Sequence, residues 1–295
     1  MKPSDFIHPE DAAALQQLQN VPGLTTLTKK FLSIGYEQIL HGVNMASCVR
    51  LSPNQLPELY NRLPPICEKL GIDVPEFYLT MDPMPNACTY GDTKIFIQIT
   101  SGLVDMLTSD ELDGVIAHEC GHILCRHVLY TTLASFVVGG IDSVDPTGWV
   151  SVPLKLALFY WQRKSELSAD RAACIITSPE VVARTQARLA GGPRSITDRL
   201  DLKLWAQQAE DYEVIRNDGL WNKTLQMYAI AANDHPFAAV RVREILKWSE
   251  SEEYGRIKQQ LDNGTYNDGL CPVCHNPIEP NWQYCQGCGE RLNKS

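Results

Sequence analysis

Residues 118–122 read His-Glu-Cys-Gly-His, an HExxH arrangement, and they constrain this chain more than any other stretch. Residues four apart on an α-helix lie one above the other on one face, so both imidazoles can reach a single metal ion. Glu119 projects beside them without having to be a ligand. Zinc takes two histidines, a third protein ligand and a water, and such a glutamate accepts a proton as that water attacks. The residues therefore favour a zinc hydrolase over a chance occurrence of the motif.

The residues before and after the motif predict a helix. Thr108 and Glu111 have the spacing of a capping box, in which each side chain binds the other residue's backbone N–H at a helix start. Apolar residues then recur with a helical period, namely Leu112, Val115, Ile116, Ile123 and Leu124. A helix is therefore expected to begin near residue 108 and to carry the motif.

A third protein ligand is expected in a second helical stretch, residues 165–173. Glu166 would complete a site of two histidines and one glutamate. Asp170, four residues later on the same face, would accept the remaining N–H of a ligand histidine and fix its tautomer. Two acidic residues at this spacing are by themselves more typical of a solvated face. The alanines of this stretch allow close packing against the HExxH helix and favour the ligand interpretation.

Residues 235–241, His-Pro-Phe-Ala-Ala-Val-Arg, form a further group. The proline biases His235 towards an extended conformation at the start of a helix, so its side chain can point into a cleft while Arg241 lies on the helix. The dipeptide alone is a weak signal, because His8-Pro9 repeats it in a polar segment to which we assign no role.

The three motifs, HExGH at 118–122, ELSAD at 166–170 and HPxxxxR at 235–241, occur in an order that resembles the M48 family of metallopeptidases. These are gluzincins that include HtpX-type and CAAX-prenyl-type proteases. The resemblance covers about residues 60–250. It implies an α+β fold that is mainly helical, with a gluzincin-type catalytic domain and a small edge-strand sheet.

A family-like edge strand is also visible. Residues 86–91, Asn-Ala-Cys-Thr-Tyr-Gly, and the strand-like residues 93–99 resemble the strand on which such enzymes bind an extended peptide. The resemblance makes Asn86 and Ala87 the expected substrate-binding residues. Cys88 stands where an aromatic residue is usual, a difference that concerns the side-chain subsite and not the backbone pairing.

Carried over residue by residue, the resemblance implies a catalytic zinc held by His118, His122 and Glu166. It implies Glu119 as general base and Asp170 as the partner of a ligand histidine. His235 would stabilise the oxyanion of the tetrahedral intermediate or orient the substrate. Arg241 is expected to hold the active-site helices together.

The 295 residues are enough for one sizeable core and a small module. We expect an N-terminal helical region at 1–60, a catalytic domain at 61–250, a linker at 251–270 and a zinc ribbon at 271–295. The formal net charge of −9 argues against a nucleic-acid partner. The N-terminal residues lead to no continuous apolar segment, so no secretory signal is visible.

The ribbon is expected from two CxxC pairs, which supply Cys271, Cys274, Cys285 and Cys288. Four thiolates at this spacing match a structural zinc site, whereas a redox motif needs only one pair. Residues 271–295 carry no net charge, so docking onto a protein partner is favoured over nucleic-acid binding. The other six cysteines lie in apolar stretches and predict buried thiols in a reducing compartment, hence a cytoplasmic protein.

Many relatives are embedded in a membrane between the HExxH helix and the third ligand. Here the longest uncharged run in that region is 15 residues, from 127 to 141, and a spanning helix needs about 20 apolar residues. We expect two amphipathic helices near 126–140 and 150–165. They either pack as a core hairpin or present a surface to a lipid or a partner, without crossing a membrane.

These features predict a zinc endopeptidase that acts on peptide or protein substrates. One alternative is a non-proteolytic adaptor or chaperone-type scaffold, but a scaffold has no need of an intact general base. A second alternative is a zinc hydrolase of non-peptide amides, which the predicted edge strand disfavours.

Overall fold

The computed structural model describes residues 1–21, 24, 37–140, 151–217 and 237–263, and near the C-terminus residues 271, 276, 278, 282–289 and 291. The part described is mainly helical, as expected. Its helices are η1 (Pro3–Asp5, 3-10), α1 (Pro9–Gln19), α3 (Glu37–Ser47), α4 (Pro57–Tyr60), α5 (Leu63–Leu70), α6 (Ser101–Met106), α7 (Ser109–Leu124), α8 (Val128–Gly140), α9 (Ser151–Ile176), α10 (Pro179–Gly191), α11 (Arg194–Thr197), α12 (Leu202–Asn217), α14 (Ala238–Ser249) and α15 (Glu252–Asp262).

A small mixed sheet accompanies these helices, and its described strands are β1 (Val49–Arg50), β2 (Glu76–Thr80), β3 (Ala87–Tyr90) and β4 (Phe96–Thr100). The strand order is β1-β2-β4-β3, with β2 and β4 parallel and the other pairs antiparallel. Their aromatic and β-branched residues suit a pleated, half-buried surface. Among the described strands β3 lies at the edge, and its register places Ala87 opposite Ile99 and Thr89 opposite Ile97.

Helix α7 begins as its sequence predicts. The Thr108 hydroxyl accepts from the Glu111 N–H, and the Glu111 carboxylate accepts from the Thr108 N–H, so the capping box is complete. Gly121 explains how closely this helix meets α9, because a Cβ at that position would lie 2.8 Å from the Cβ of Ala172. The two helices therefore pack with little space between them, and the faces that carry the HExxH and ELSAD residues meet.

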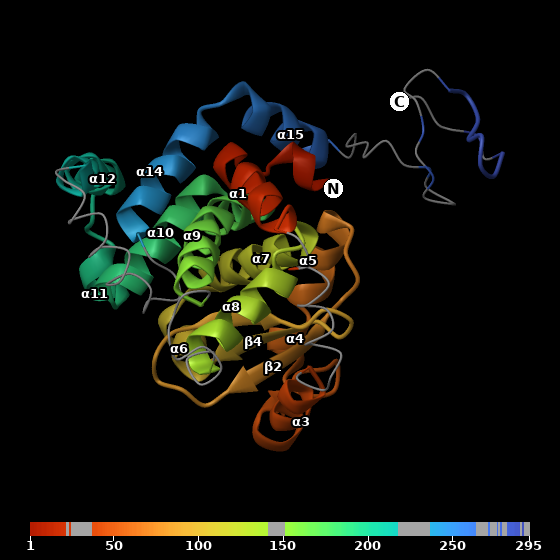
Figure 1. Ribbon diagram of the computed structural model, residues 1–295, viewed down its shortest axis with the longest axis horizontal. Coiled ribbons are helices and arrows are strands. Elements are labelled where there is room, and N and C mark those ends of the chain that lie inside the picture. Colours follow the sequence, from red (N-terminus) through yellow and green to blue (C-terminus); the bar gives the residue numbers. More distant parts are fainter. Residues whose placement is uncertain are drawn as a thin grey trace.

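The core surrounds this helix pair. In Figure 1 the sheet and α3 lie at the lower end of the molecule, α14 and α15 at the upper end, and α7 and α9 between them. The main cluster joins the sheet, α5, α7, α9 and α14, and it includes Phe77, Ile97, Ile116, Ala173 and Trp248. A smaller cluster joins α1 to α8 and α9, and it includes Leu15, Leu18, Tyr130, Leu158 and Trp161.

Three expected boundaries differ in the structure. The helix expected near 150–165 is α9, which continues to Ile176 and carries Glu166 on the same element. Residues 252–262, expected within a linker, form α15, and its Ile257 is buried against the main cluster. The expected N-terminal region does not stand apart, because Phe6 and Leu51 belong to the main cluster. No helix among the described residues is long and apolar enough to cross a membrane.

Candidate metal centre and active site

Three donor atoms from α7 and α9 converge on one point. The Nε2 atoms of His118 and His122 lie 3.2 Å apart, and each lies 3.4 Å from an oxygen of Glu166. All three side chains are buried. Helical spacing explains the convergence of the two histidines, and the close α7–α9 approach at Gly121 explains how Glu166 reaches them.

These separations fit zinc. Ligand atoms around a tetrahedral zinc with bonds of about 2.0–2.1 Å lie about 3.3–3.4 Å from one another. The 3.2 Å between the two Nε2 atoms is close to that spacing, and each Nε2 lies 3.4 Å from one of the two Glu166 oxygens, His118 from Oε2 and His122 from Oε1. Two imidazole nitrogens and a carboxylate oxygen are also a donor set that zinc accepts readily. The three residues that the sequence proposes as ligands are therefore brought together in an arrangement that fits a zinc ion.

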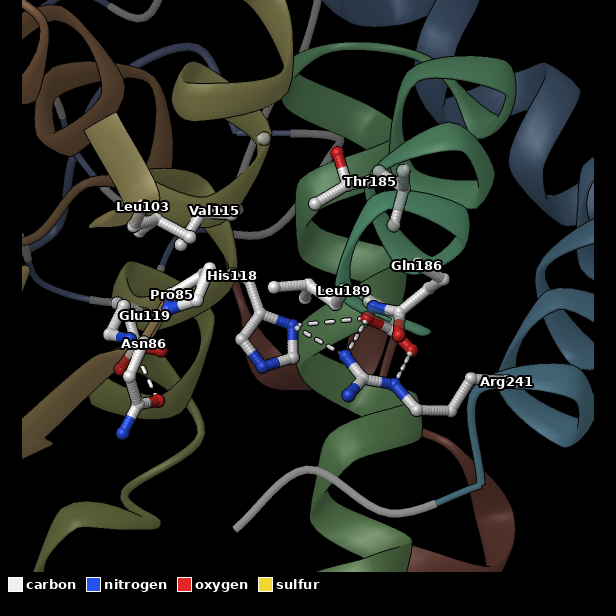
Figure 2. Close-up of a pocket in the computed structure, with 14 residues that line it drawn as sticks. Pro85, Asn86, Leu103, Val115, His118, Glu119, Thr185, Gln186, Leu189 and Arg241 are labelled. Carbon is white, nitrogen blue, oxygen red and sulfur yellow. Dashed lines mark hydrogen bonds and ion pairs between the residues drawn. The ribbon is translucent and has the colours of Figure 1, made fainter. Parts of the chain in front are cut away.

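Asp170 and Arg241 contact two of the three residues that supply these donors, His118 and Glu166. His118 Nδ1 lies 3.1 Å from Asp170 Oδ1, and Arg241 donates to both oxygens of Asp170 at 2.6 and 2.7 Å. Arg241 Nη1 also lies 2.9 Å from Glu166 Oε2. Figure 2 shows the His118 ring beside the Arg241 guanidinium, with a dashed line between them. The arginine thus links α14 to two carboxylates of α9 and orients the glutamate.

The charges of this network decide its protonation. Burial favours the neutral ring of His118, but the hydrogen bonds and charges of Asp170 and Glu166 outweigh it and raise the pKa of His118 to about 9. Burial would also raise the pKa of Asp170, yet Arg241 and His118 hold that pKa below its ordinary value. Asp170 is therefore an ionised acceptor for the Nδ1–H of His118, which leaves Nε2 to face the metal site.

Glu119 lies beside the donor atoms and is held by the sheet. Its Oε2 accepts a hydrogen bond of 2.6 Å from the Thr89 hydroxyl on β3, and only 2% of Glu119 is exposed. Sequence reasoning did not single out Thr89. Its place in the Asn-Ala-x-Thr stretch, with period-2 alternation, was the available signal, because this alternation turns Thr89 towards the inside of the molecule.

Two cavities extend from Glu119 along β3. One, of about 450 Å³, is lined by Asn86, Ala87 and His118 and by apolar side chains that include Leu103, Val115 and Leu189. Figure 2 shows this cavity with Thr185 and Gln186 on its α10 wall. The other, of about 510 Å³, has a lining that includes Cys88, Tyr90, His122, Thr131, Gln162 and Glu166. Residues of the edge strand thus line both cavities.

Two predicted site residues lie outside the described residues, namely His235 and Cys274. Phe237, two positions after His235, has a φ of +68°, a left-handed conformation that is unusual for a bulky residue. Backbone strain of this kind clusters at functional sites. Because His235 itself lies outside the described residues, its role stays a prediction from the sequence.

The C-terminal cysteines form a second cluster. Donor atoms of Cys271, Cys285 and Cys288 all lie within 4.8 Å of one another, and the sulfurs of Cys271 and Cys288 are 3.5 Å apart. Thiolates around tetrahedral zinc, with bonds of about 2.3 Å, lie about 3.8 Å apart. The Gly287 N–H also donates to the Cys285 sulfur at 3.3 Å. The cluster is compatible with a zinc ribbon.

None of the remaining cysteines in the described residues forms a disulfide. Cys120 points away from the ligands, as expected from its helical position, and its sulfur lies 3.9 Å from that of Cys67. The contact with Cys67, together with burial, raises the pKa of Cys120 well above its ordinary value. A protonated, buried thiol is a poor metal ligand.

Two histidines and a glutamate that converge beside a second glutamate define a metallopeptidase-type centre. Residues 54–249 match Peptidase family M48, and the chain belongs to this family. The resemblance drawn from the motifs is thereby confirmed, and the protein is a metallopeptidase of a family that uses zinc.

Curated relatives agree with this assignment. The plastoglobule-localized metallopeptidase 48 of Arabidopsis thaliana chloroplasts is 36% identical over 264 residues, which cover 88% of this chain and 76% of that protein. Protease HtpX homologues are 33% identical over 105 residues in Pelotomaculum thermopropionicum and 37% identical over 103 residues in Thermococcus sibiricus. These matches span 37% and 35% of the two HtpX proteins. No solved structure matches this chain.

Proposed function

We propose that this metallopeptidase is a zinc-dependent endopeptidase in which His118, His122 and Glu166 hold the metal and Glu119 is the general base. The observation that carries the proposal is the convergence of His118 Nε2, His122 Nε2 and the Glu166 carboxylate, at contacts of 3.2–3.4 Å, beside a second, oriented glutamate. When bound, zinc would supply Lewis-acid polarisation of the substrate carbonyl and make water a stronger nucleophile.

The chain's own residues then carry the proton transfers. Thr89 donates to Oε2 of Glu119 and fixes the carboxylate plane. Oε1 of Glu119 takes a proton from the attacking water and returns it to the leaving amine. His235 is proposed to stabilise the oxyanion or to orient the substrate, and Arg241 to hold Glu166 and Asp170 in place.

The substrate is proposed to bind as an extended strand along β3. Ala87 and Thr89 lie on the edge strand beside Glu119, and Asn86 borders both cavities. Main-chain pairing gives affinity in this mode, and cavities for alternate side chains give selectivity. The apolar lining at Leu103, Val115 and Leu189 favours an apolar substrate side chain next to the cleaved bond.

A variant of Glu119 tests the proposal. Glu119→Gln should keep the catalytic zinc and the fold while kcat on peptides falls about 10²–10⁴-fold, because the amide cannot accept the proton. Glu68→Gln, an exposed change on α5, is the matched control and should behave as wild type. Near-normal hydrolysis by Glu119→Gln would refute the base assignment. A folded, zinc-loaded wild type that cleaves no peptide would favour the adaptor or chaperone-type scaffold.

We also propose that Cys271, Cys285 and Cys288, together with Cys274, hold a second, structural zinc. The support is the sulfur cluster among the first three and the two CxxC pairs of the sequence. The ribbon is proposed to dock a protein partner.

A further inference from the structure

A turn at the end of α7 folds His127 back onto the ligand His122. Arg126 adopts a left-handed conformation with a φ of +59°. Its N–H donates to the Ile123 oxygen at 3.0 Å, and the His127 N–H donates to the His122 oxygen at 2.9 Å. This is the hydrogen-bond pattern of a Schellman motif. The turn brings the two rings together, and their Nδ1 atoms lie 3.0 Å apart.

Helix α1 supplies the next contact. His127 Nε2 lies 2.9 Å from Asp11 Oδ2, and both side chains are 0% exposed. The same oxygen accepts a hydrogen bond of 2.5 Å from the Ser168 hydroxyl, which itself accepts from the His8 N–H at 2.9 Å. Ser168 lies on α9 between Glu166 and Asp170. An unbroken set of contacts therefore runs from a ligand histidine to the N-terminal helix.

The donors and acceptors of this set have one consistent assignment. His122 offers Nε2 to the metal site, so its ring proton is on Nδ1 and is donated to His127. His127 must then accept through Nδ1, which places its own proton on Nε2, facing Asp11. A carboxylate only accepts hydrogen bonds, so Asp11 stabilises this tautomer of His127 and no other. Burial opposes ionisation, but His127 and Ser168 hold the pKa of Asp11 below its ordinary value, so the group is an acceptor.

We propose that Asp11 and His127 are positioning residues that fix the tautomer and ring orientation of His122 and thereby raise the zinc affinity of the site. The inference rests on the proposed function through His122 as a ligand. Both ligand histidines are then oriented by a carboxylate, His118 directly by Asp170 and His122 indirectly by Asp11. Asp11 lies outside residues 54–249, so the family match does not include it.

The test is the zinc affinity of the full-length protein, measured by competition with a chelator. Loss of a residue that orients a metal ligand typically weakens metal binding about 10–100-fold, and this is the effect expected for Asp11→Asn and His127→Leu. Asn at position 11 has nearly the same shape as Asp, but its NH₂ can turn towards His127 and favour the wrong tautomer. His118→Ala gives the baseline of zinc that remains at the cysteine cluster.

A matched pair at position 127 separates positioning from packing. His127→Asn retains an acceptor atom close to the place of Nδ1, whereas His127→Leu has similar size and no acceptor. His127→Asn should therefore recover most of the affinity that His127→Leu loses. Leu18→Ala loosens α1 in the small cluster without touching Asp11, and it should lower the melting temperature while zinc affinity stays at the wild-type value.

The outcomes are distinct. Wild-type zinc affinity in Asp11→Asn and His127→Leu would mean that the pair only anchors α1, and the inference would be wrong. Equal losses in His127→Asn and His127→Leu would also overturn it, because the acceptor would not matter. If wild type binds no more zinc than His118→Ala, the proposed function itself fails. These results can be told apart because zinc affinity is measured without turnover.

Discussion

The two clusters of metal-binding residues are built in opposite ways. The donors of the catalytic centre come from α7 and α9, Arg241 of α14 contacts Glu166, and side chains of β3 and α1 contact Glu119 and His127 beside them. The described sulfurs of the second cluster all come from residues 271–288, close together along the chain. One site is held by the core of the protein, whereas the proposed ribbon would be held by its metal, because so short a segment has little core of its own.

This difference has a physical consequence. Ligands fixed by packing and by buried ion pairs keep their geometry without metal, so metal loss should cost activity more than fold. In a ribbon, by contrast, metal-binding energy is folding energy. Changes at one cluster should therefore leave the other intact, and each experiment below tests that separation or the network that underlies it.

Loss of a catalytic ligand should have the largest effect. His118→Ala should release one of two zinc ions and abolish peptide cleavage, because the two remaining donors hold zinc too weakly. Metal analysis of the purified protein checks this, with Cys285→Ala as the reciprocal variant that should release the other zinc. A single zinc that persists in His118→Ala would refute the assignment of His118, His122 and Glu166.

The sequence predicted the donors because their chemistry depends on local spacing. One helical turn places His118 and His122 on the same face, and one turn of a second helix does the same for Glu166 and Asp170. The capping box at Thr108 fixed the start of α7 for the same reason. The family match and the mainly helical fold with a small sheet confirm the sequence prediction at that level.

Residues that act across the fold escaped the sequence analysis. Asp11 meets His127 only when α1 packs against α8 and α9, and Thr89 meets Glu119 only when β3 lies beside α7. The polar residues of α15 suggested a linker, because a single buried side chain, Ile257, is too weak a periodic signal. Tertiary packing decides these cases, and one sequence does not encode it as a readable pattern.

The buried ion network should give the second largest effect. Arg241→Met removes the cation that faces Asp170 and Glu166, and all three side chains are at most 5% exposed. A buried charge left without its partner typically destabilises a protein by about 3–5 kcal/mol. The free energy of unfolding in urea checks this for the metal-free protein. Arg184→Met, which breaks an exposed pair with Glu180, is the control and should cost about 0–1 kcal/mol.

A smaller effect concerns pH. The pKa of His118 is about 9 in the folded protein, above the ordinary value of 6.5, so protonation of this ring stabilises the metal-free fold below pH 6.5. That contribution disappears as the pH rises through 9. Zinc binds only the unprotonated Nε2 of His118. Between pH 6.5 and pH 9 zinc binding therefore releases this proton, and the release should raise the zinc affinity about tenfold per pH unit. Chelator competition at several pH values measures the slope.

Asp170→Asn sharpens the pH experiment. Asp170 is one of the two carboxylates that raise the pKa of His118, so its loss should move the rising part of the affinity curve to lower pH. The ribbon zinc, measured in the His118→Ala background, serves as the internal control. An affinity for the catalytic zinc that does not change between pH 7 and 8 would contradict the protonation assigned to His118.

The smallest effect is expected when the second cluster is removed altogether. Truncation after Tyr266 deletes the four C-terminal cysteines and keeps α15. In this helix Ile257 belongs to the main cluster and the Tyr254 ring packs against Trp248. The shortened protein should fold, bind one zinc and cleave short peptides with nearly unchanged kcat/KM, because none of the deleted residues that the structure describes supplies a donor to the catalytic centre. A second truncation before Glu252 also removes α15 and should lower the melting temperature, because α15 packs against the main cluster. The first truncation point must therefore lie after this helix. If the first protein is folded and zinc-loaded but fails on short peptides, the C-terminal cluster must contribute to the cleft itself. If it fails only on large protein substrates, the cluster acts in docking, and the two sites are separate in function as well as in construction.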